Sequence, residues 1–122
     1  MKPRKTENFL RAMESLEDAI ALPVQNQRDM AGIIQNFEFV YELGWKMLKE
    51  RLEEQGIIAN SPKEVLEKAY QVKFIEEENL WLEIIKARNL STHTYDRELA
   101  EKLVLDIKSK FMKAFLNLKN SI

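Results

Sequence analysis

Apolar residues recur every three or four positions along most of the chain, a spacing that gathers them on one face of a helix. A first series ends before Pro23, and a longer second series covers residues 26–56, where Gly56 is suited to end a helix. The inward-facing positions are predicted to be Phe9, Met13, Leu16 and Ile20, then Met30, Ile34, Phe37, Tyr41, Leu48 and Leu52.

Three further helices are predicted by the same pattern. In the motif SPKE, residues 61–64, Ser61 can cap a helix, Pro62 suits its first turn and Glu64 can complete a capping box. A fourth helix is expected from about residue 77 to 89, and a fifth from about residue 96 to the end. Their inward-facing residues are predicted to be Val65, Leu66, Ala69 and Tyr70, then Leu80, Trp81, Ile84 and Ile85, then Leu99, Leu103, Ile107, Phe111, Ala114 and Leu118.

The pattern therefore predicts an all-α fold. The chain has only three glycines and three prolines, and it shows neither a β-hairpin signal nor a sustained alternation of apolar and polar residues. Short connections between amphipathic helices favour antiparallel neighbours. We expect residues 1–122 to form a single domain, an up-down antiparallel bundle of about five helices, which is long enough to bury a core without disulfides.

The amino-acid composition limits the cellular compartment and the kinds of chemical site that we expect. The chain contains no cysteine, which excludes disulfides and thiolate metal sites. Its apolar runs are too short to span a bilayer and its basic N-terminus lacks an apolar signal core, so a cytoplasmic protein with no membrane contact is expected. With 19 basic and 20 acidic residues, bulk charge does not favour coating of nucleic acid, but a local RNA site is compatible.

Candidate chemistry lies where the fourth helix ends. Arg88 follows Trp81 by seven residues and Ile84 by four, which places its guanidinium on the apolar face, where it must be paired, reach solvent or serve a purpose. The only histidine, His93, follows in the stretch LSTHT, whose residue types loosen helix ends. If the chain unwinds after Asn89, His93 could fold back toward Arg88, and a cation beside an imidazole suits phosphoryl chemistry.

An alternative interpretation of this segment remains open: a polar helix end in which Arg88 and His93 cap carbonyl groups and Tyr95 packs. A polar stripe on the second helix carries two more candidates, because Glu38 or Glu42 could pair with Arg88 and orient it. The alternative for this stripe, which also contains Gln35 and Trp45, is a solvated face with a Glu42–Lys46 pair. One histidine with two carboxylates does not favour a metal site, so none is expected.

The stretch RNLSTHTY, residues 88–95, resembles the Arg-x4-His-x-Tyr motif of the HEPN superfamily, in the branch of HepT-like toxins. This branch is also known as the nucleotidyltransferase substrate-binding protein family. The similarity extends through GIIQNFEFVYELGWKMLKERLEEQG, SPKEVLEKAY and LWLEIIKARNLSTHTYD, and so covers roughly residues 30–100. The resemblance implies a small helical bundle that forms a homodimer and is usually encoded beside a minimal nucleotidyltransferase.

The resemblance also implies roles for four residues. Arg88 and His93 match the ribonuclease pair, Asn89 matches the polar residue that commonly follows the arginine, and Tyr95 matches the tyrosine to which the partner nucleotidyltransferase transfers AMP. The leading hypothesis is a HEPN-type toxin, a metal-independent endoribonuclease without cofactors that is silenced by this AMPylation. The alternatives are a non-catalytic substrate-binding subunit of a nucleotidyltransferase and a purely structural dimerisation bundle.

The chemistry of RNA cleavage gives a separate reason to expect a homodimer. Attack by a ribose 2′-hydroxyl needs proton removal, proton donation and stabilisation of the charge on phosphorus. One chain offers one histidine. A two-fold dimer would bring two histidines and two arginines into one cleft.

Overall fold

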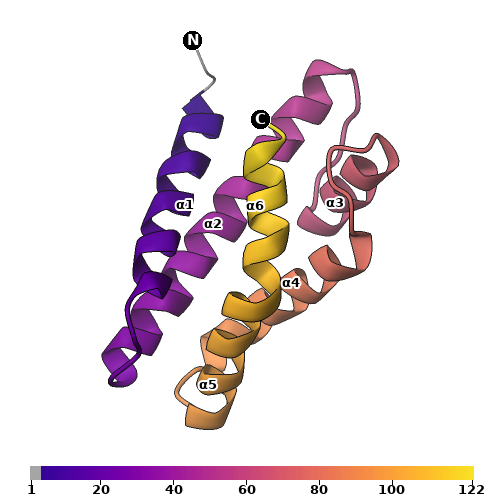
Figure 1. The fold of residues 1–122 in the computed structure, drawn as a ribbon. Helices are drawn as coiled ribbons and strands as arrows, with labels where there is room; N and C mark the ends of the chain where they lie inside the picture. Colours follow the sequence, from indigo (N-terminus) through magenta and orange to yellow (C-terminus); the bar gives the residue numbers. More distant parts are fainter. Residues whose placement is uncertain (1–3) are drawn as a thin grey trace.

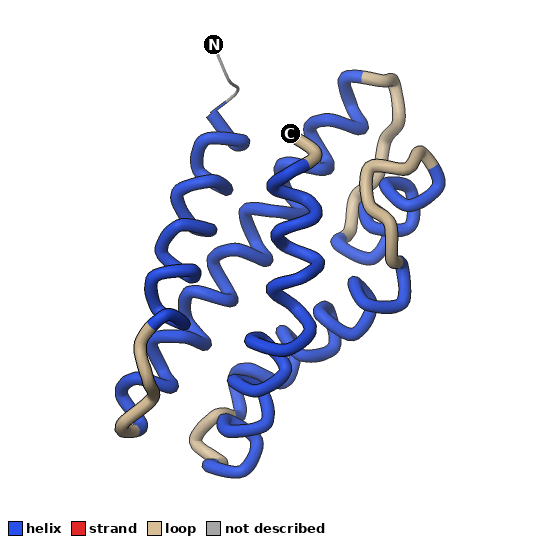
Figure 2. Tube along the Cα trace, in the orientation of Figure 1, coloured by secondary structure: helices blue, strands red, loops and turns tan. Residues whose placement is uncertain are grey.

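The computed structural model describes residues 4–122, and this part of the chain is helical with short connections and no strand (Figure 2). Helix α1 covers Arg4–Ala21 and lies along the long helix α2, Gln27–Glu54, which runs back in the opposite direction (Figure 1). The all-α bundle predicted from the sequence is confirmed. No helix within residues 4–122 is both long and apolar enough to cross a membrane.

Both ends of α2 lie close to the predicted boundaries. The Asn26 side chain caps the helix by accepting the Asp29 N–H at 2.9 Å, which satisfies one of the free donors of the first turn. At the other end Gly56 takes a φ of +77°, a conformation that glycine adopts without steric cost. In between, Gly44 allows close contact with α1, where the Phe9 ring lies against the position a Cβ atom would take.

Helix α3, Pro62–Gln71, begins as predicted, with the Ser61 hydroxyl accepting the Glu64 N–H at 3.2 Å. The prediction that Tyr70 faces inward is wrong, because 44% of it is exposed. The buried side of α3 is formed by Val65, Leu66 and Ala69. Tyr70 follows the last of these buried residues, Ala69, and lies next to the end of the helix. There its ring can pack while its hydroxyl reaches water.

The fourth and fifth predicted helices are joined by a tight turn. Helix α4 covers Glu78–Leu90, a 3₁₀ turn η1 covers Ser91–His93, and α5 covers Arg97–Asp106. The fifth helix then continues as a π-helical segment η2, Ile107–Phe111, and as α6, Met112–Asn120. The sequence prediction of one uninterrupted helix missed this π segment.

The core brings these elements together through aromatic rings. Phe37 of α2 stacks on Phe111 of η2 with ring centroids 5.6 Å apart, and it lies 6.0 Å from Phe115 of α6. Trp81 of α4 approaches Phe115 at 5.6 Å. This packing holds α4 against the middle of α2, and the last turn of α4 therefore meets the polar stripe of α2.

Candidate functional site

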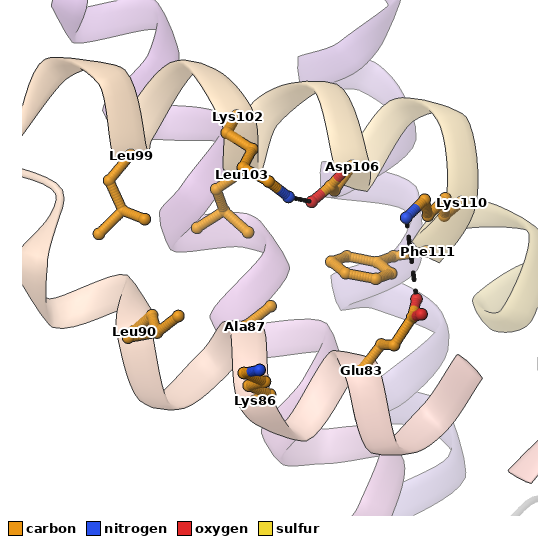
Figure 3. Close-up of a pocket in the computed structure, with 10 residues that line it drawn as sticks. All are labelled: Glu83, Lys86, Ala87, Leu90, Leu99, Lys102, Leu103, Asp106, Lys110 and Phe111. Carbon is orange, nitrogen blue, oxygen red and sulfur yellow. Dashed lines mark hydrogen bonds and ion pairs between the residues drawn. The ribbon is translucent and has the colours of Figure 1, made fainter. Parts of the chain in front are cut away.

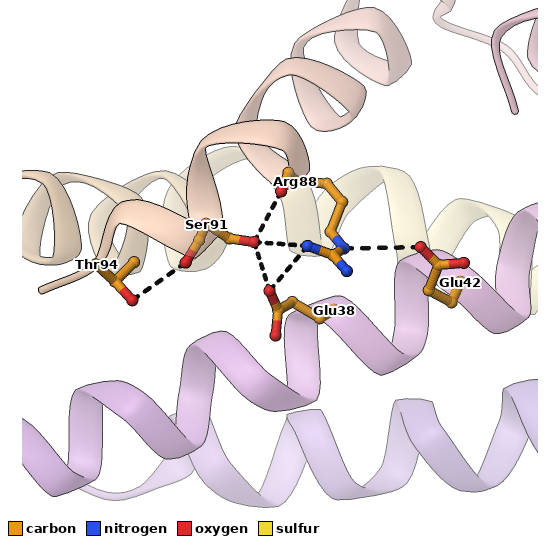
Figure 4. Close-up of polar contacts among 5 residues, drawn as sticks. All are labelled: Glu38, Glu42, Arg88, Ser91 and Thr94. Atoms are coloured by element: carbon orange, nitrogen blue, oxygen red, sulfur yellow. Dashed lines mark hydrogen bonds and ion pairs between the residues drawn. The ribbon is translucent and has the colours of Figure 1, made fainter.

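Arg88 lies in the last turn of α4 and points toward α2 (Figure 4). Its Nη1 is 3.0 Å from a carboxylate oxygen of Glu38, and its Nε is 3.6 Å from one of Glu42. About a quarter of the Arg88 and Glu38 side chains is exposed, against 38% of the Glu42 side chain. The structure thus brings together the three residues whose pairing the sequence suggested, and the guanidinium is half-buried with its charge compensated.

Sequence reasoning missed Ser91, the first residue of η1, which is only 3% exposed. Its hydroxyl oxygen accepts a hydrogen bond from Arg88 Nη1 at 3.0 Å. Its single hydrogen faces two acceptors, the Glu38 carboxylate and the Arg88 carbonyl (Figure 4). The available signal was a serine three residues after Arg88 at a helix end, a place where serine commonly bonds to backbone carbonyls.

Glu42 has a second partner on its own helix. Trp45 Nε1 donates to its other carboxylate oxygen at 3.2 Å, while Lys46 is exposed. Of the predicted stripe, Glu38 contacts Arg88, and Glu42 contacts both Arg88 and Trp45, whereas Gln35 is exposed. The neighbouring Tyr41 is buried, and burial, aided by the charge of Glu42 and opposed by that of Arg88, raises its pKa to about 12.

His93 and Tyr95 form a second small group beyond the helix end. His93 Nδ1 lies 3.3 Å from the Tyr95 hydroxyl oxygen, and the two rings meet edge-on with centroids 5.9 Å apart. Tyr95 is 85% exposed and His93 is also exposed. Both side chains are therefore accessible to a second macromolecule.

The two groups are not in contact within one chain. Helix α4 continues through Asn89 to Leu90 rather than unwinding after Asn89, and η1 then carries His93 to the surface. Across residues 4–122 no hydrogen bond or ion pair joins Arg88 to His93 or to the exposed Asn89. His93 therefore does not fold back toward Arg88 within the single chain, as it could have done if the chain had unwound after Asn89, because the helix continues to Leu90.

Other features of the surface lie apart from these groups. A hollow of about 380 Å³ separates α4 from α5 and η2, with an apolar floor that includes Leu99, Leu103 and Phe111 and a rim of lysines and acids (Figure 3). None of the predicted site residues lines it. In the described part of the chain, no three acidic, histidine or cysteine side chains are grouped in a way that could hold a metal ion.

Comparison with protein families gives one match that covers residues 4–122, to the family described as nucleotidyltransferase substrate binding protein like. Among curated proteins, the chain is 38% identical over 76 residues to a Haemophilus influenzae protein named "Probable ribonuclease HepT". That match covers 58% of this chain and 52% of the relative, so the chain spans about half the length of the protein it matches.

Two solved structures share the fold over nearly their whole length, each with a TM-score of 0.84. One is a protein of Thermus thermophilus, at 26% identity, covering 92% of this chain and 96% of the other. The second comes from Haemophilus influenzae, at 29% identity, covering 94% and 96% respectively. It is described as revealing the fold of a substrate-binding domain of a nucleotidyltransferase.

Proposed function

The chain belongs to the nucleotidyltransferase substrate-binding protein-like family, and from this membership and the geometry around Arg88 we propose that it is a cytoplasmic, metal-independent endoribonuclease of the HEPN type. In this proposal it is the toxin of a toxin–antitoxin pair whose antitoxin is a minimal nucleotidyltransferase. The observation that carries the proposal is a half-buried arginine in the last turn of α4 followed by an exposed histidine five residues later. The similarity to a relative named as a ribonuclease supports the same activity.

The proposed reaction is cleavage of an RNA phosphodiester by its own 2′-hydroxyl. His93 would remove the 2′-hydroxyl proton or donate a proton to the leaving 5′-oxygen, and Arg88 would stabilise the charge that develops on the phosphate oxygens. Because one chain has a single histidine, the proposal includes a homodimer in which the two chains supply base and acid to one cleft. Asn89, exposed beside Arg88, is proposed to contact the RNA.

Replacement of the histidine tests this function. We expect His93→Ala to lower the cleavage rate on total cellular RNA by roughly two to four orders of magnitude. Helicity and melting temperature should stay nearly unchanged, because His93 is exposed and outside the core. A wild-type protein that cleaves no RNA and is not toxic when expressed would contradict the ribonuclease and favour the second candidate.

We further propose that Tyr95 is the site of silencing. Its phenol oxygen would attack the α-phosphorus of ATP in the partner's active site, forming a phosphodiester, releasing pyrophosphate and losing the phenolic proton. The 85% exposure of Tyr95 leaves its hydroxyl within reach of a second protein. Attached AMP would place a negative charge and a bulky base next to His93, where RNA is proposed to dock.

The switch can be followed by intact mass and peptide mapping after incubation with the partner, ATP and Mg²⁺. We expect wild type to gain AMP on Tyr95 and to lose activity, and Tyr95→Phe to remain unmodified and active. Tyr70→Phe is the matched control, since Tyr70 is also exposed but lies on α3. The switch would be refuted if AMP were attached to another residue. It would also be refuted if the wild type stayed unmodified under conditions in which the partner is active.

The second candidate is a non-catalytic subunit that binds substrate for a nucleotidyltransferase. The family description and the description of the Haemophilus influenzae structure favour it. It predicts a stable complex with the nucleotidyltransferase and unchanged cellular function in the His93→Ala variant. The ribonuclease predicts loss of toxicity in the same variant.

A further inference from the structure

The nitrogens of Arg88 are engaged unequally by the residues around them (Figure 4). Nη1 makes two hydrogen bonds of 3.0 Å, one to Glu38 and one to Ser91. Nε is buried and has no hydrogen-bond partner, since the nearest oxygen of Glu42 is 3.6 Å away. A donor buried without a partner is costly, so this edge of the guanidinium gains from meeting an acceptor at closer range.

On the side of the guanidinium that faces Glu38, the hydrogen bonds join residues that are largely shielded from solvent. One carboxylate oxygen of Glu38 receives both Arg88 Nη1 and the Ser91 hydroxyl. Ser91 is buried, and its carbonyl accepts the Thr94 hydroxyl at 3.1 Å, which ties η1 to the same group. Removing Glu38 from Arg88 would therefore break two hydrogen bonds at one carboxylate oxygen, those from Arg88 Nη1 and from the buried Ser91 hydroxyl.

On the side of the guanidinium that faces Glu42, the partner carboxylate is more exposed to solvent. The Glu42 side chain is 38% exposed, and its second oxygen already holds the Trp45 Nε1 hydrogen bond at 3.2 Å. Glu42 can leave Arg88 while keeping that bond and gaining water. With both carboxylates in place the group carries a formal charge of −1, which repels a phosphodiester, and displacement of Glu42 removes one of the two negative charges from the guanidinium.

We propose that Glu38 and Ser91 fix the position of Arg88, whereas Glu42 is an exchangeable counter-ion that an RNA phosphodiester displaces. The phosphate then takes the Nε and Nη2 donors together, the parallel geometry in which arginine holds phosphate most strongly. The inference rests on the proposed ribonuclease site and assigns Glu38 and Ser91 as positioning residues. Glu42 competes with the substrate for the same edge of the guanidinium.

The test uses single-stranded RNA with a 2′-O-methyl group on every ribose, which cannot be cut by 2′-hydroxyl attack. Its dissociation constant is measured for the full chain at low ionic strength. We expect Glu42→Gln to tighten binding by roughly twofold to fivefold, because an exchangeable partly exposed ion pair is weak. Ser91→Ala should weaken binding by roughly twofold to tenfold, and Ser91→Thr, which keeps the hydroxyl, should restore it.

Two controls separate exchange at Arg88 from a general change in charge. Glu54→Gln removes the same charge from an exposed position at the end of α2, and should change binding less than Glu42→Gln does. In an Arg88→Met background the effect of Glu42→Gln should vanish. Circular dichroism establishes that each variant is folded before its binding is compared.

Each result supports or overturns the exchange. It is overturned if the wild type does not bind this RNA, if Glu42→Gln matches Glu54→Gln, or if the gain persists without Arg88. It is supported if the gain is specific to Glu42 and needs Arg88. Cleavage of unmodified RNA is measured separately, so a wild type that binds in this way but cuts nothing contradicts the ribonuclease and leaves the exchange standing.

Discussion

The two glycines inside α2 have opposite surroundings, and this difference predicts opposite effects of the same substitution. Around Gly32 there is open space, so Gly32→Ala should raise the free energy of unfolding by about 0.5–1 kcal/mol through helix propensity. At Gly44 a Cβ atom would lie 3.3 Å from Cε1 of the fully buried Phe9. Overpacking there costs roughly 1–3 kcal/mol, which exceeds the gain in propensity.

Urea unfolding of the two variants measures both effects on one helix. We expect Gly32→Ala to be more stable than wild type and Gly44→Ala to be less stable. A Gly44→Ala variant at least as stable as wild type would mean that the Phe9 ring moves aside without loss, and that α1 and α2 do not need this close contact.

Because Tyr41 is buried, we expect the folded chain to lose stability at high pH. Its pKa is about 12 in the folded chain, mainly because it is buried, against an ordinary value near 10. The unfolded chain loses this proton first as pH rises, so the contribution is fully present below pH 10 and is lost between pH 10 and 12. The loss should be at most about 3 kcal/mol, because one pKa unit corresponds to about 1.4 kcal/mol.

This loss is measured as the difference in unfolding free energy between wild type and Tyr41→Phe at a series of pH values. The lysines that titrate in the same range are common to both proteins and cancel. The tyrosinate absorbance of the folded wild type should show a late ionisation that is missing in Tyr41→Phe. A pH-independent difference between the two proteins would contradict the assigned cause.

At the scale of elements, the apolar period correctly predicted the helices and most of their buried faces, because these depend on local spacing alone. It did not predict that α4 runs to Leu90, nor that Ser91 is buried. Buried Ser91 donates its hydroxyl to Glu38, 53 positions earlier in the chain, and a local pattern does not contain such a pairing. The prediction that Tyr70 faces inward was wrong for a similar reason. How far a side chain at the end of α3 is buried depends on which other segments pack there, and local spacing does not contain that information.

The π segment has a counterpart in the spacing of apolar residues along the sequence. Apolar residues at 99, 103, 107, 111 and 115 are spaced by four, and in a regular α-helix each such step turns the face by about 40°. The wider turn of η2 compensates for part of this drift. It allows Leu103, Ile107, Phe111 and Phe115 all to be buried.

At the scale of the whole molecule, the proposed homodimer gives a prediction about exposed apolar side chains on the two helices that carry Glu38 and Arg88. On α2, Phe39 is 52% exposed, and at the end of α4, Leu90 is 41% exposed. Such residues are common in the centre of subunit interfaces. We expect the wild type to have twice the 14.4 kDa chain mass in solution, and Phe39→Glu to be monomeric.

Light scattering at micromolar concentration measures this mass. Ile58→Glu is the matched control, since Ile58 is 72% exposed but lies in the connection between α2 and α3, and this variant should stay dimeric. A monomeric wild type would refute the mechanism with two histidines in one cleft. A dimeric Phe39→Glu variant would place the interface on another face.

The π segment also decides where the chain can change in length. Because η2 accommodates one residue more than an α-helix does, deletion of the exposed Ser109 would turn it into a regular helix and keep the faces of both α5 and α6 toward the core. Deletion of Lys113, which is also exposed but lies in α6, would rotate every later residue by about 100° and turn Phe115 and Leu118 away from the core. We expect the first deletion to fold and the second not to, as judged by the cooperativity of thermal unfolding, so in related chains a one-residue gap in the last helix should fall at η2.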